Sequence, residues 1–312
     1  MQFNNLRLGF LMILAFAASK TSAVQTNQDA VLIAAGDIAV CEAVHRAEWT
    51  ARLVEKLLNR NDAVVVTLGD NSQNDGRFEE YLKCFEPAWG RFKQKLRPSP
   101  GNHDDYDERP GLGHGGKAYY EYFGDRAGPP GLGYYSFDLG YWHIVSLNSE
   151  IVVNRPTPEQ AQRMQSQMNW LRRDLSTHDN HQCTLAYFHR PMVSSGQFAA
   201  GRMRRLWEVL YARGVDVILN GHEHFYERFA PQDHRGNLDH RFGIRQFIVG
   251  TGGAYFHGFG RPTPNSVMAI QETLGVIQFV LRPSHYLWEF IDIHGVVRDA
   301  GVGECHGKPE IF

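Results

Sequence analysis

The sequence has no long basic run, no second long apolar segment and no closely spaced pair of cysteines. Its formal net charge is −2 over 312 residues, and the lack of a basic stripe argues against a nucleic-acid-binding surface. The one extended apolar run, Leu8 to Ala18, is too short to span a membrane. None of the four cysteines belongs to a CxxC pair, so a thiolate zinc site is not expected. There is also no internal repeat.

The N-terminus has the features of an export signal. Arg7 precedes the apolar run, and Thr21-Ser22-Ala23 offers small residues for cleavage. We therefore expect residues 1–23 to be a signal peptide and residues 24–312 to form one domain of a periplasmic or secreted protein. The alternative is an uncleaved membrane anchor. Cleavage would remove two cations and no acid, and would leave no membrane span.

An even number of cysteines in an exported protein favours disulfides, with three connectivities open. The cysteines are Cys41, Cys84, Cys183 and Cys305. Cys41 and Cys84 each follow an acidic cluster after a predicted strand, so neighbouring strands would bring them together. We therefore favour Cys41–Cys84 and Cys183–Cys305. Free buried cysteines are the alternative.

Short apolar runs alternate with helical patterns in the first part of the chain. Runs such as VLIAA (31–35) and AVVVTL (63–68) are typical of buried parallel strands. Helices are predicted at 43–60 and at 157–178, where Thr157 and Gln160 form a capping-box pattern. Further strands follow at 245–249, 276–281 and 286–293. This order predicts an α/β fold with two mixed sheets packed face to face and helices outside. The Gly- and Pro-rich stretch 109–133 is expected to be a surface loop.

Polar clusters follow several of these apolar runs. They are Gly36-Asp37, Gly69-Asp70-Asn71, Gly101-Asn102-His103-Asp104, His189 and Gly221-His222-Glu223-His224. Ligands of open α/β sheets bind just outside the carboxyl ends of the strands, so these side chains are candidate metal ligands in one crevice. Two carboxylates, an amide oxygen and three imidazoles can hold two cations, which suits phosphate-ester hydrolysis. His103 could then protonate the leaving oxygen.

Simpler interpretations exist for several of these residues. Asp37 and Asp70 could be helix caps, and Asn102 could be a turn residue. Arg190 and Arg228 could contact an anionic substrate or form salt bridges. Gly250-Thr251-Gly252-Gly253 could be a phosphate cradle, but a turn bringing backbone close to the metals is favoured because no Lys follows. His114 and His257 lie in Gly-rich loops and are secondary candidates for lining the pocket.

The order and spacing of the five clusters resemble those of the calcineurin-like metallophosphoesterases. The string from Gly221 to Arg228 is similar to the purple acid phosphatase branch. This resemblance implies the four-layer αββα fold and two metal ions, with iron, zinc and manganese as candidates. By resemblance the first metal would take Asp37, Asp70 and His224. The second would share Asp70 and add Asn102, His189 and His222; His103 would be catalytic, and Asp104 would orient nearby groups.

Two positions depart from the family pattern. Ala39 stands where many members have His, and Gln73 stands where purple acid phosphatases have Tyr. Gln73 could supply an amide oxygen as a weak ligand, or water could fill the position. Without the tyrosinate, no charge-transfer colour is expected. We therefore predict weaker affinity at the first site.

The function expected from the sequence is hydrolysis of a small phosphate ester by an exported enzyme. Two metals would supply a hydroxide that attacks a phosphomonoester, with His103 assisting the leaving group. Diesters remain open as further substrates. The alternatives are a dedicated phosphodiesterase of nucleotides or lipid head groups, and a non-catalytic protein that binds metal or phosphate.

Overall fold

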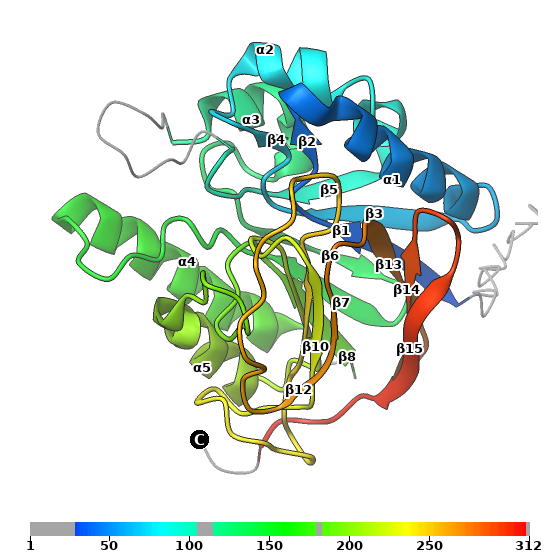
Figure 1. The fold of residues 1–312 in the computed structure, drawn as a ribbon. Helices are drawn as coiled ribbons and strands as arrows, with labels where there is room; N and C mark the ends of the chain where they lie inside the picture. The colour runs from blue at the N-terminus through cyan, green and yellow to red at the C-terminus, as the bar shows by residue number, and fades with distance from the viewer. Residues whose placement is uncertain (1–28, 105–114, 179–182, 310–312) are drawn as a thin grey trace, which may run out of the picture.

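The computed structural model describes residues 29–104, 115–178 and 183–309. The predicted signal peptide and His114 lie outside these residues. In the described part, no helix combines the length and the apolarity needed to cross a membrane. The chain forms two large β-sheets that lie between two groups of helices (Figure 1).

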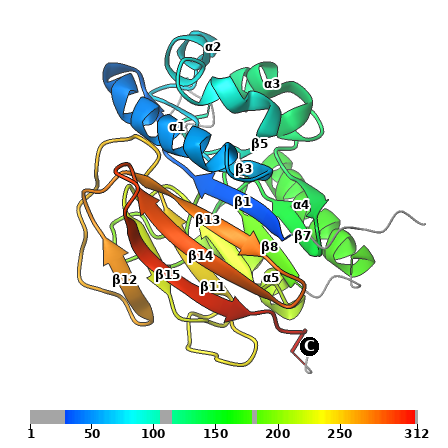
Figure 2. The same ribbon diagram turned by 90° about the vertical axis from the view of Figure 1, so that its right-hand side faces the viewer.

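The first sheet joins N-terminal parallel strands to C-terminal antiparallel ones. Its parallel part is β1 (Ala30–Ala35), β3 (Ala63–Leu68) and β5 (Leu96–Ser99). On the other side of β1 come β13 (Gly275–Leu281), β14 (His285–Asp292) and β15 (Val297–Glu304), all antiparallel to their neighbours. Figure 2 shows the C-terminal strands beside β1. The sheet is therefore mixed, as predicted.

The second sheet has a parallel centre and antiparallel edges. Its centre is β7 (Trp142–Ser146), β8 (Cys183–Tyr187), β9 (Val217–Asn220) and β11 (Arg245–Val249). The edges are β6 (Tyr135–Leu139) on one side, and β10 (Tyr226–Phe229) with β12 (Ser266–Ile270) on the other. A separate pair, β2 (Ala39–Val40) and β4 (Ser72–Gln73), lies after β1 and β3.

Helices cover the outer faces of the two sheets. α1 (Val44–Leu58), α2 (Phe78–Glu80) and α3 (Lys117–Phe123) lie on the side of the first sheet, and α4 (Pro158–Thr177) and α5 (Arg204–Ala212) on the side of the second (Figure 1). Short helical turns are η1 (Cys41–Ala43), η2 (Tyr81–Phe85), η3 (Trp89–Lys95), η4 (Gly124–Ala127) and η5 (Gly201–Met203). α4 begins at the predicted capping box, in which Thr157 and Gln160 bond reciprocally.

Both faces of the central strands are buried, which explains their continuous apolar runs. Along β9, Val217 and Leu219 belong to the core between the sheets, whereas Ile218 faces the core beneath α4 and α5. That second core contains Met168 and Leu171 of α4. The predicted four-layer αββα fold is confirmed.

The prediction of one long loop at 109–133 is wrong for its described part. α3 and η4 lie within it, and Tyr119, Tyr122 and Phe123 of α3 are buried. The Gly and Pro residues flank this helix, and its aromatic residues pack with Tyr81 and Phe85. The prediction was wrong because the Gly and Pro content was judged over the whole stretch, which contains a short apolar helix.

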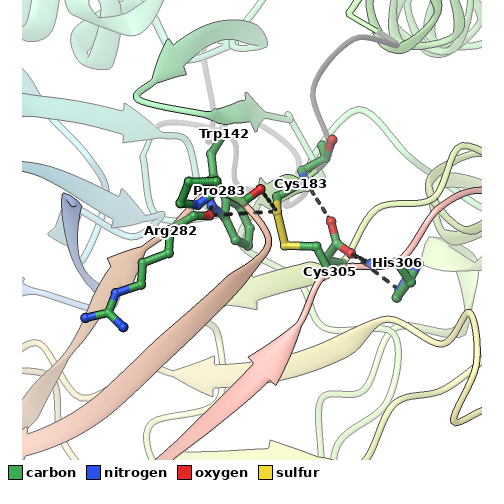
Figure 3. The surroundings of a disulfide bond; sticks show 8 residues. Trp142, Cys183, Arg282, Pro283, Cys305 and His306 are labelled. Carbon is green, nitrogen blue, oxygen red and sulfur yellow. Dashed lines mark hydrogen bonds and ion pairs between the residues drawn. A yellow bond between two sulfur atoms is a disulfide. The ribbon is translucent and has the colours of Figure 1, made fainter. Parts of the chain in front are cut away.

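Both predicted disulfides are present. Cys41–Cys84 connects η1 with η2, with Cα atoms 5.1 Å apart. Cys183–Cys305 joins the start of β8 to the residue after β15, with Cα atoms 5.4 Å apart. In Figure 3 this second bond lies beside Trp142, whose indole N–H donates to the Arg282 carbonyl at 2.8 Å. The second bond therefore links the two sheets.

Candidate metal centre

The predicted ligands all lie just beyond the carboxyl ends of parallel strands. Asp37, Asp70 and Asn102 follow β1, β3 and β5 of the first sheet. His189 follows β8, and His222 with His224 follows β9 of the second sheet. The ends of the two sheets meet here, because the Gly36 amide after β1 donates to the Val249 carbonyl of β11 at 2.9 Å.

Three of these residues have a left-handed backbone conformation. The φ angles are +57° at Asp37, +49° at Asp70 and +71° at His222. For a residue other than glycine this conformation costs on the order of 1–3 kcal/mol, and such strain is concentrated at functional sites. Gly221 allows close approach beside them, because a Cβ there would lie 2.7 Å from Asp37 Oδ2.

One group of candidate ligands surrounds the Nε2 atom of His189. This atom lies 3.2 Å from Asp70 Oδ2, 3.1 Å from Asn102 Oδ1 and 3.0 Å from His222 Nδ1. The other ring nitrogen of His189 donates to the Leu68 carbonyl at 2.9 Å. A backbone carbonyl bound in this way fixes the ring orientation of metal-binding histidines.

A second group joins Asp37 to His224. Asp37 Oδ1 is 3.1 Å from His224 Nε2, and Oδ2 accepts a hydrogen bond from the His222 amide at 2.8 Å. The Nδ1 of His224 is bonded to the Tyr255 carbonyl, so its Nε2 has the lone pair in the neutral ring. Both groups thus share the segment 221–224.

The chemistry of these atoms fits metal ions. Carboxylate, amide and unprotonated imidazole atoms are acceptors, and here they face one another at about hydrogen-bonding distance. Such a cluster requires either protons or cations between its members. Asp37 Oδ1 is buried and has no hydrogen-bond partner among the described residues, as expected for an atom that binds a cation. Imidazole with carboxylate suits zinc, iron and manganese.

The surroundings of His189 and His222 shift their pKa values in opposite directions. Burial disfavours charge on His189, but the charge and hydrogen bond of Asp70, together with the charges of Asp37 and Glu150, outweigh it and raise the pKa of the imidazole to about 10. Burial, followed by the charges of His189 and Arg190, places the pKa of His222 well below its usual value. Of these two neighbouring imidazoles, His189 therefore takes up a proton more readily than His222.

His103 lies beside the ligand groups without joining them. Its amide donates to Asp70 Oδ1 at 2.8 Å, and its Nδ1 is 2.7 Å from the Asn74 carbonyl. A carbonyl only accepts, so Nδ1 has the proton and Nε2 is the second site for one. The charge of Asp70 raises the pKa of His103, which favours its protonated, acidic form.

Asp104 positions the loops that hold the ligands. Its buried carboxylate accepts hydrogen bonds from the amides of Asn71 and Gly101, at 3.0 and 2.8 Å, and from the Tyr81 hydroxyl. These bonds connect the loops after β3 and β5. The role of Asp104 in orienting the groups of the metal centre, expected from the sequence, stays a prediction.

The two candidate arginines have different surroundings. The Arg190 guanidinium bonds Glu150 through Nε at 2.7 Å and lies 3.0 Å from His222 Nε2, so it borders the cluster. Arg228 forms two hydrogen bonds with Asp299, at 2.7 and 3.0 Å. Arg228 therefore forms a salt bridge, and its role in substrate binding stays a prediction.

The two positions that depart from the family pattern lie in neighbouring strands. Ala39 and Gln73 belong to the β2–β4 pair, and both are buried. The Gln73 side-chain nitrogen is buried without a hydrogen-bond partner among the described residues. Its role as a weak ligand stays a prediction.

Sequence reasoning missed Glu223 and Glu150. Glu223 is wholly buried between the two ligand histidines of segment 221–224, and Glu150 holds Arg190. Glu150 belongs to Asn148-Ser149-Glu150, which follows β7 as the other polar clusters follow their strands. This cluster could have been recognised from its position after a strand, but unlike the other clusters it contains no glycine or histidine. The backbone of Gly250 does approach the cluster, because a Cβ there would lie 2.7 Å from Asp37 Oδ2.

Comparison with known proteins agrees with the fold. The family model for calcineurin-like phosphoesterases matches residues 30–226. The chain therefore belongs to the calcineurin-like phosphoesterase family, and the predicted resemblance is confirmed. Purple acid phosphatase 23 of Arabidopsis thaliana is 32% identical over 214 residues, covering 57% of this chain and 44% of that protein. Purple acid phosphatase 21 of the same plant is 28% identical over 223 residues, covering 62% and 45%.

A solved structure shows the same fold. The purple acid phosphatase PPD1 from yellow lupin (Lupinus luteus) superposes with a TM-score of 0.65 at 17% identity. The superposition covers 88% of this chain and 54% of the lupin chain. The two Arabidopsis relatives are matched over less than half of their length.

Proposed function

We propose that this protein is an exported, dinuclear metal-dependent phosphoesterase that prefers phosphomonoesters. The observation that carries the proposal is that six ligand-type side chains from two sheets form two adjoining groups of close contacts. Membership of the phosphoesterase family and the purple acid phosphatase relatives support the reaction class. The substrate is a small phosphate ester.

The proposed ligands of the first metal are Asp37, Asp70 and His224. Those of the second are Asp70, Asn102, His189 and His222, with Asp70 shared. When bound, two such ions lower the pKa of water toward neutrality and neutralise the negative charge that develops on the phosphate oxygens. Iron, zinc and manganese all suit these ligands.

Two further side chains act on the substrate. Arg190 has a permanent positive charge beside His222 and is held there by Glu150, so it favours an anionic phosphate at this edge of the cluster. His103 donates the proton that the leaving oxygen takes up as its bond to phosphorus breaks. The hydrogen bond from Nδ1 to Asn74 leaves Nε2 as the donating atom.

Export is supported by two features. The predicted signal at residues 1–23 would direct the chain out of the cytoplasm. Two disulfides, with every described cysteine paired, are typical of an oxidising compartment.

The deciding experiment measures hydrolysis of a chromogenic phosphomonoester and its bis-ester by metal-loaded protein across a range of pH. We expect the monoester to give the higher kcat/KM. Asp37→Asn should abolish turnover, whereas the control Asp62→Asn, at an exposed carboxylate, should not. Faster bis-ester hydrolysis would replace the proposal with a phosphodiesterase. No turnover of either would leave a metal-binding scaffold.

A further inference from the structure

Aromatic rings from two loops lie against the ligand histidines. Phe198 belongs to the loop between β8 and α5, and His257 to the loop between β11 and β12. The Phe198 ring centroid is 5.7 Å from His222 and 5.1 Å from His257. The His257 ring stacks on His224 at 3.5 Å. A continuous row of four rings, His222, Phe198, His257 and His224, therefore borders the proposed metal centre.

Glu223 fixes the position of Phe198. Its buried carboxylate accepts hydrogen bonds from the Phe198 amide at 2.6 Å and from the Ser194 hydroxyl at 3.1 Å. Because Glu223 lies between His222 and His224 in the sequence, it ties the Phe198 loop directly to the segment that contains these ligands. Gly196 allows this approach, since a Cβ there would lie 2.3 Å from Glu223 Oε2.

Ser195 joins the two loops to each other. Its carbonyl accepts from the Gly260 amide at 2.8 Å, and its hydroxyl accepts from the Thr263 amide at 2.9 Å. The hydroxyl in turn bonds the buried Glu227. The loop that contains Phe198 and the loop that contains His257 are thus joined by hydrogen bonds, so little ordering is required when a ligand binds against Phe198.

Phe198 remains exposed despite this fixed position. Its exposed fraction is 45%, and that of Tyr255, two residues before His257, is 55%. An apolar ring cannot bind the phosphate itself, so a ring at the edge of a phosphate site contacts the organic part of the ester. Aromatic rings prefer other aromatic rings in offset or edge-to-face geometry.

We propose that Phe198, together with His257, forms an aromatic wall that selects phosphate esters whose leaving group carries a planar aromatic ring. This inference rests on the proposed phosphoesterase function and names its substrate class. The reaction is ordinary hydrolysis: water oxygen bonds to phosphorus, the phosphorus–oxygen bond to the leaving group breaks, and that oxygen takes up a proton.

The test compares two esters that differ only in the nature of the ring. Benzyl phosphate and cyclohexylmethyl phosphate both release primary alkoxides, so leaving-group basicity differs little between them. For the wild-type metal-loaded protein, kcat/KM should be about 3- to 10-fold higher for the benzyl ester, the size of one aromatic pair. Phe198→Leu should remove this preference, and Phe198→Tyr should retain it.

Tyr141→Leu is the matched control. Tyr141 is an exposed aromatic residue, 40% accessible, in the turn between β6 and β7. This turn precedes β7 and therefore lies at the amino ends of the parallel strands, away from the metal centre. The control should keep the full benzyl preference. Equal kcat/KM for the two esters in the wild type, or an unchanged preference in Phe198→Leu, would contradict the proposed aromatic wall.

A binding measurement separates this inference from the catalytic proposal. Calorimetric titration with benzylphosphonate and cyclohexylmethylphosphonate should give a Kd about 3- to 10-fold lower for the benzyl compound in the wild type. Phe198→Leu should give equal Kd values. If neither ester is hydrolysed, the proposed function fails, and the titration alone decides whether the wall exists. Equal Kd values of the two phosphonates for the wild type would contradict the proposed aromatic wall, whether or not the protein hydrolyses the esters.

Discussion

Several candidate ligand residues combine a left-handed backbone with well-defined hydrogen bonds. Asp70 has a left-handed backbone. One of its carboxylate oxygens accepts a hydrogen bond from the His103 amide, and the other faces His189. In His189 and in His224, one ring nitrogen is hydrogen-bonded to a backbone carbonyl. Side chains held in this way present ligand atoms in fixed directions without rearrangement. The residues therefore give a prearranged site.

His103→Ala tests the role of a single residue that is not among the proposed metal ligands. We expect kcat to fall by on the order of 10²-fold or more, because the leaving oxygen loses its proton donor. The metal content should stay unchanged. Steady-state kinetics and elemental analysis of the same preparation measure both, with His240→Ala, an exposed histidine, as control. Loss of metal from the variant would assign His103 a different role.

Ala39 and Gln73 predict unequal metal sites. The first site has three assigned ligands, Asp37, Asp70 and His224, whereas the second has four. Fewer protein ligands give weaker binding, so calorimetric titration of metal-free protein should resolve a tight and a weaker event. Gln73→Leu should weaken only the latter if the amide is a ligand. Two events of equal affinity in the wild type would refute the assignment.

At the scale of elements, the sequence predicted the parts of the fold that depend on local pattern. The limits of β11, the capping box of α4 and the amphipathic α1 all follow from residue spacing. α3, β5 and β15 were not predicted. β5 contains Pro98, and β15 alternates exposed and buried residues around glycines packed on Trp288 and Tyr286. Such strands depend on partners far along the chain, which one sequence does not reveal.

The candidate site was predictable for a related reason. Each ligand follows a strand whose apolar run is easy to recognise, and the edge where parallel strands end is set by topology. Glu223 and Phe198 could not be assigned in this way, because their roles depend on contacts between loops. Phe198 is bound by Glu223, 25 residues away in the sequence. Contacts of this kind require the folded chain.

A histidine clamp connects β6, β7 and α4 and should make stability depend on pH. Buried His143 bonds Asp138 through Nδ1 at 2.9 Å and Asp174 through Nε2 at 2.8 Å. The His178 ring stacks on it at 3.9 Å. Burial lowers the pKa of His143, but the hydrogen bonds to the two carboxylates outweigh it, so this pKa lies above its usual value.

A histidine whose pKa is higher in the folded than in the unfolded protein stabilises the fold. This stabilisation is complete at pH values below the pKa of the unfolded state, about 6.5, and is lost as the pH rises through the pKa of the folded state. His143→Gln should therefore lower the free energy of unfolding by about 1 kcal/mol more at about pH 5 than at about pH 9. Denaturant unfolding at both pH values measures this, with exposed His45→Gln as control. The same loss at both pH values would contradict the clamp.

The Cys183–Cys305 disulfide is a second connection between elements that should contribute to stability. It links β8 of one sheet to the end of β15 of the other and closes a loop with a sequence separation of 122. Replacing both cysteines with serine should lower the free energy of unfolding by about 2–4 kcal/mol. Urea unfolding of the double variant beside wild type under oxidising conditions tests it. Equal midpoints and slopes would show that the bond adds no stability.

At the scale of the whole molecule, the two sheets together position one group of candidate ligands. Each sheet contributes candidate ligands from the carboxyl ends of its parallel strands, and the glycines between them allow close approach. The candidate ligands extend from Asp37 to His224, so the site forms only when both sheets have assembled. Folding and metal binding are therefore expected to be linked.

The metal content of Asp70→Ala tests the central claim most directly. Elemental analysis of wild-type protein should give about two metal ions per chain. The variant should lose both, because Asp70 is the ligand that the two sites share, while the exposed Asp62→Ala retains both. A variant that still binds one ion at wild-type affinity would contradict the shared centre.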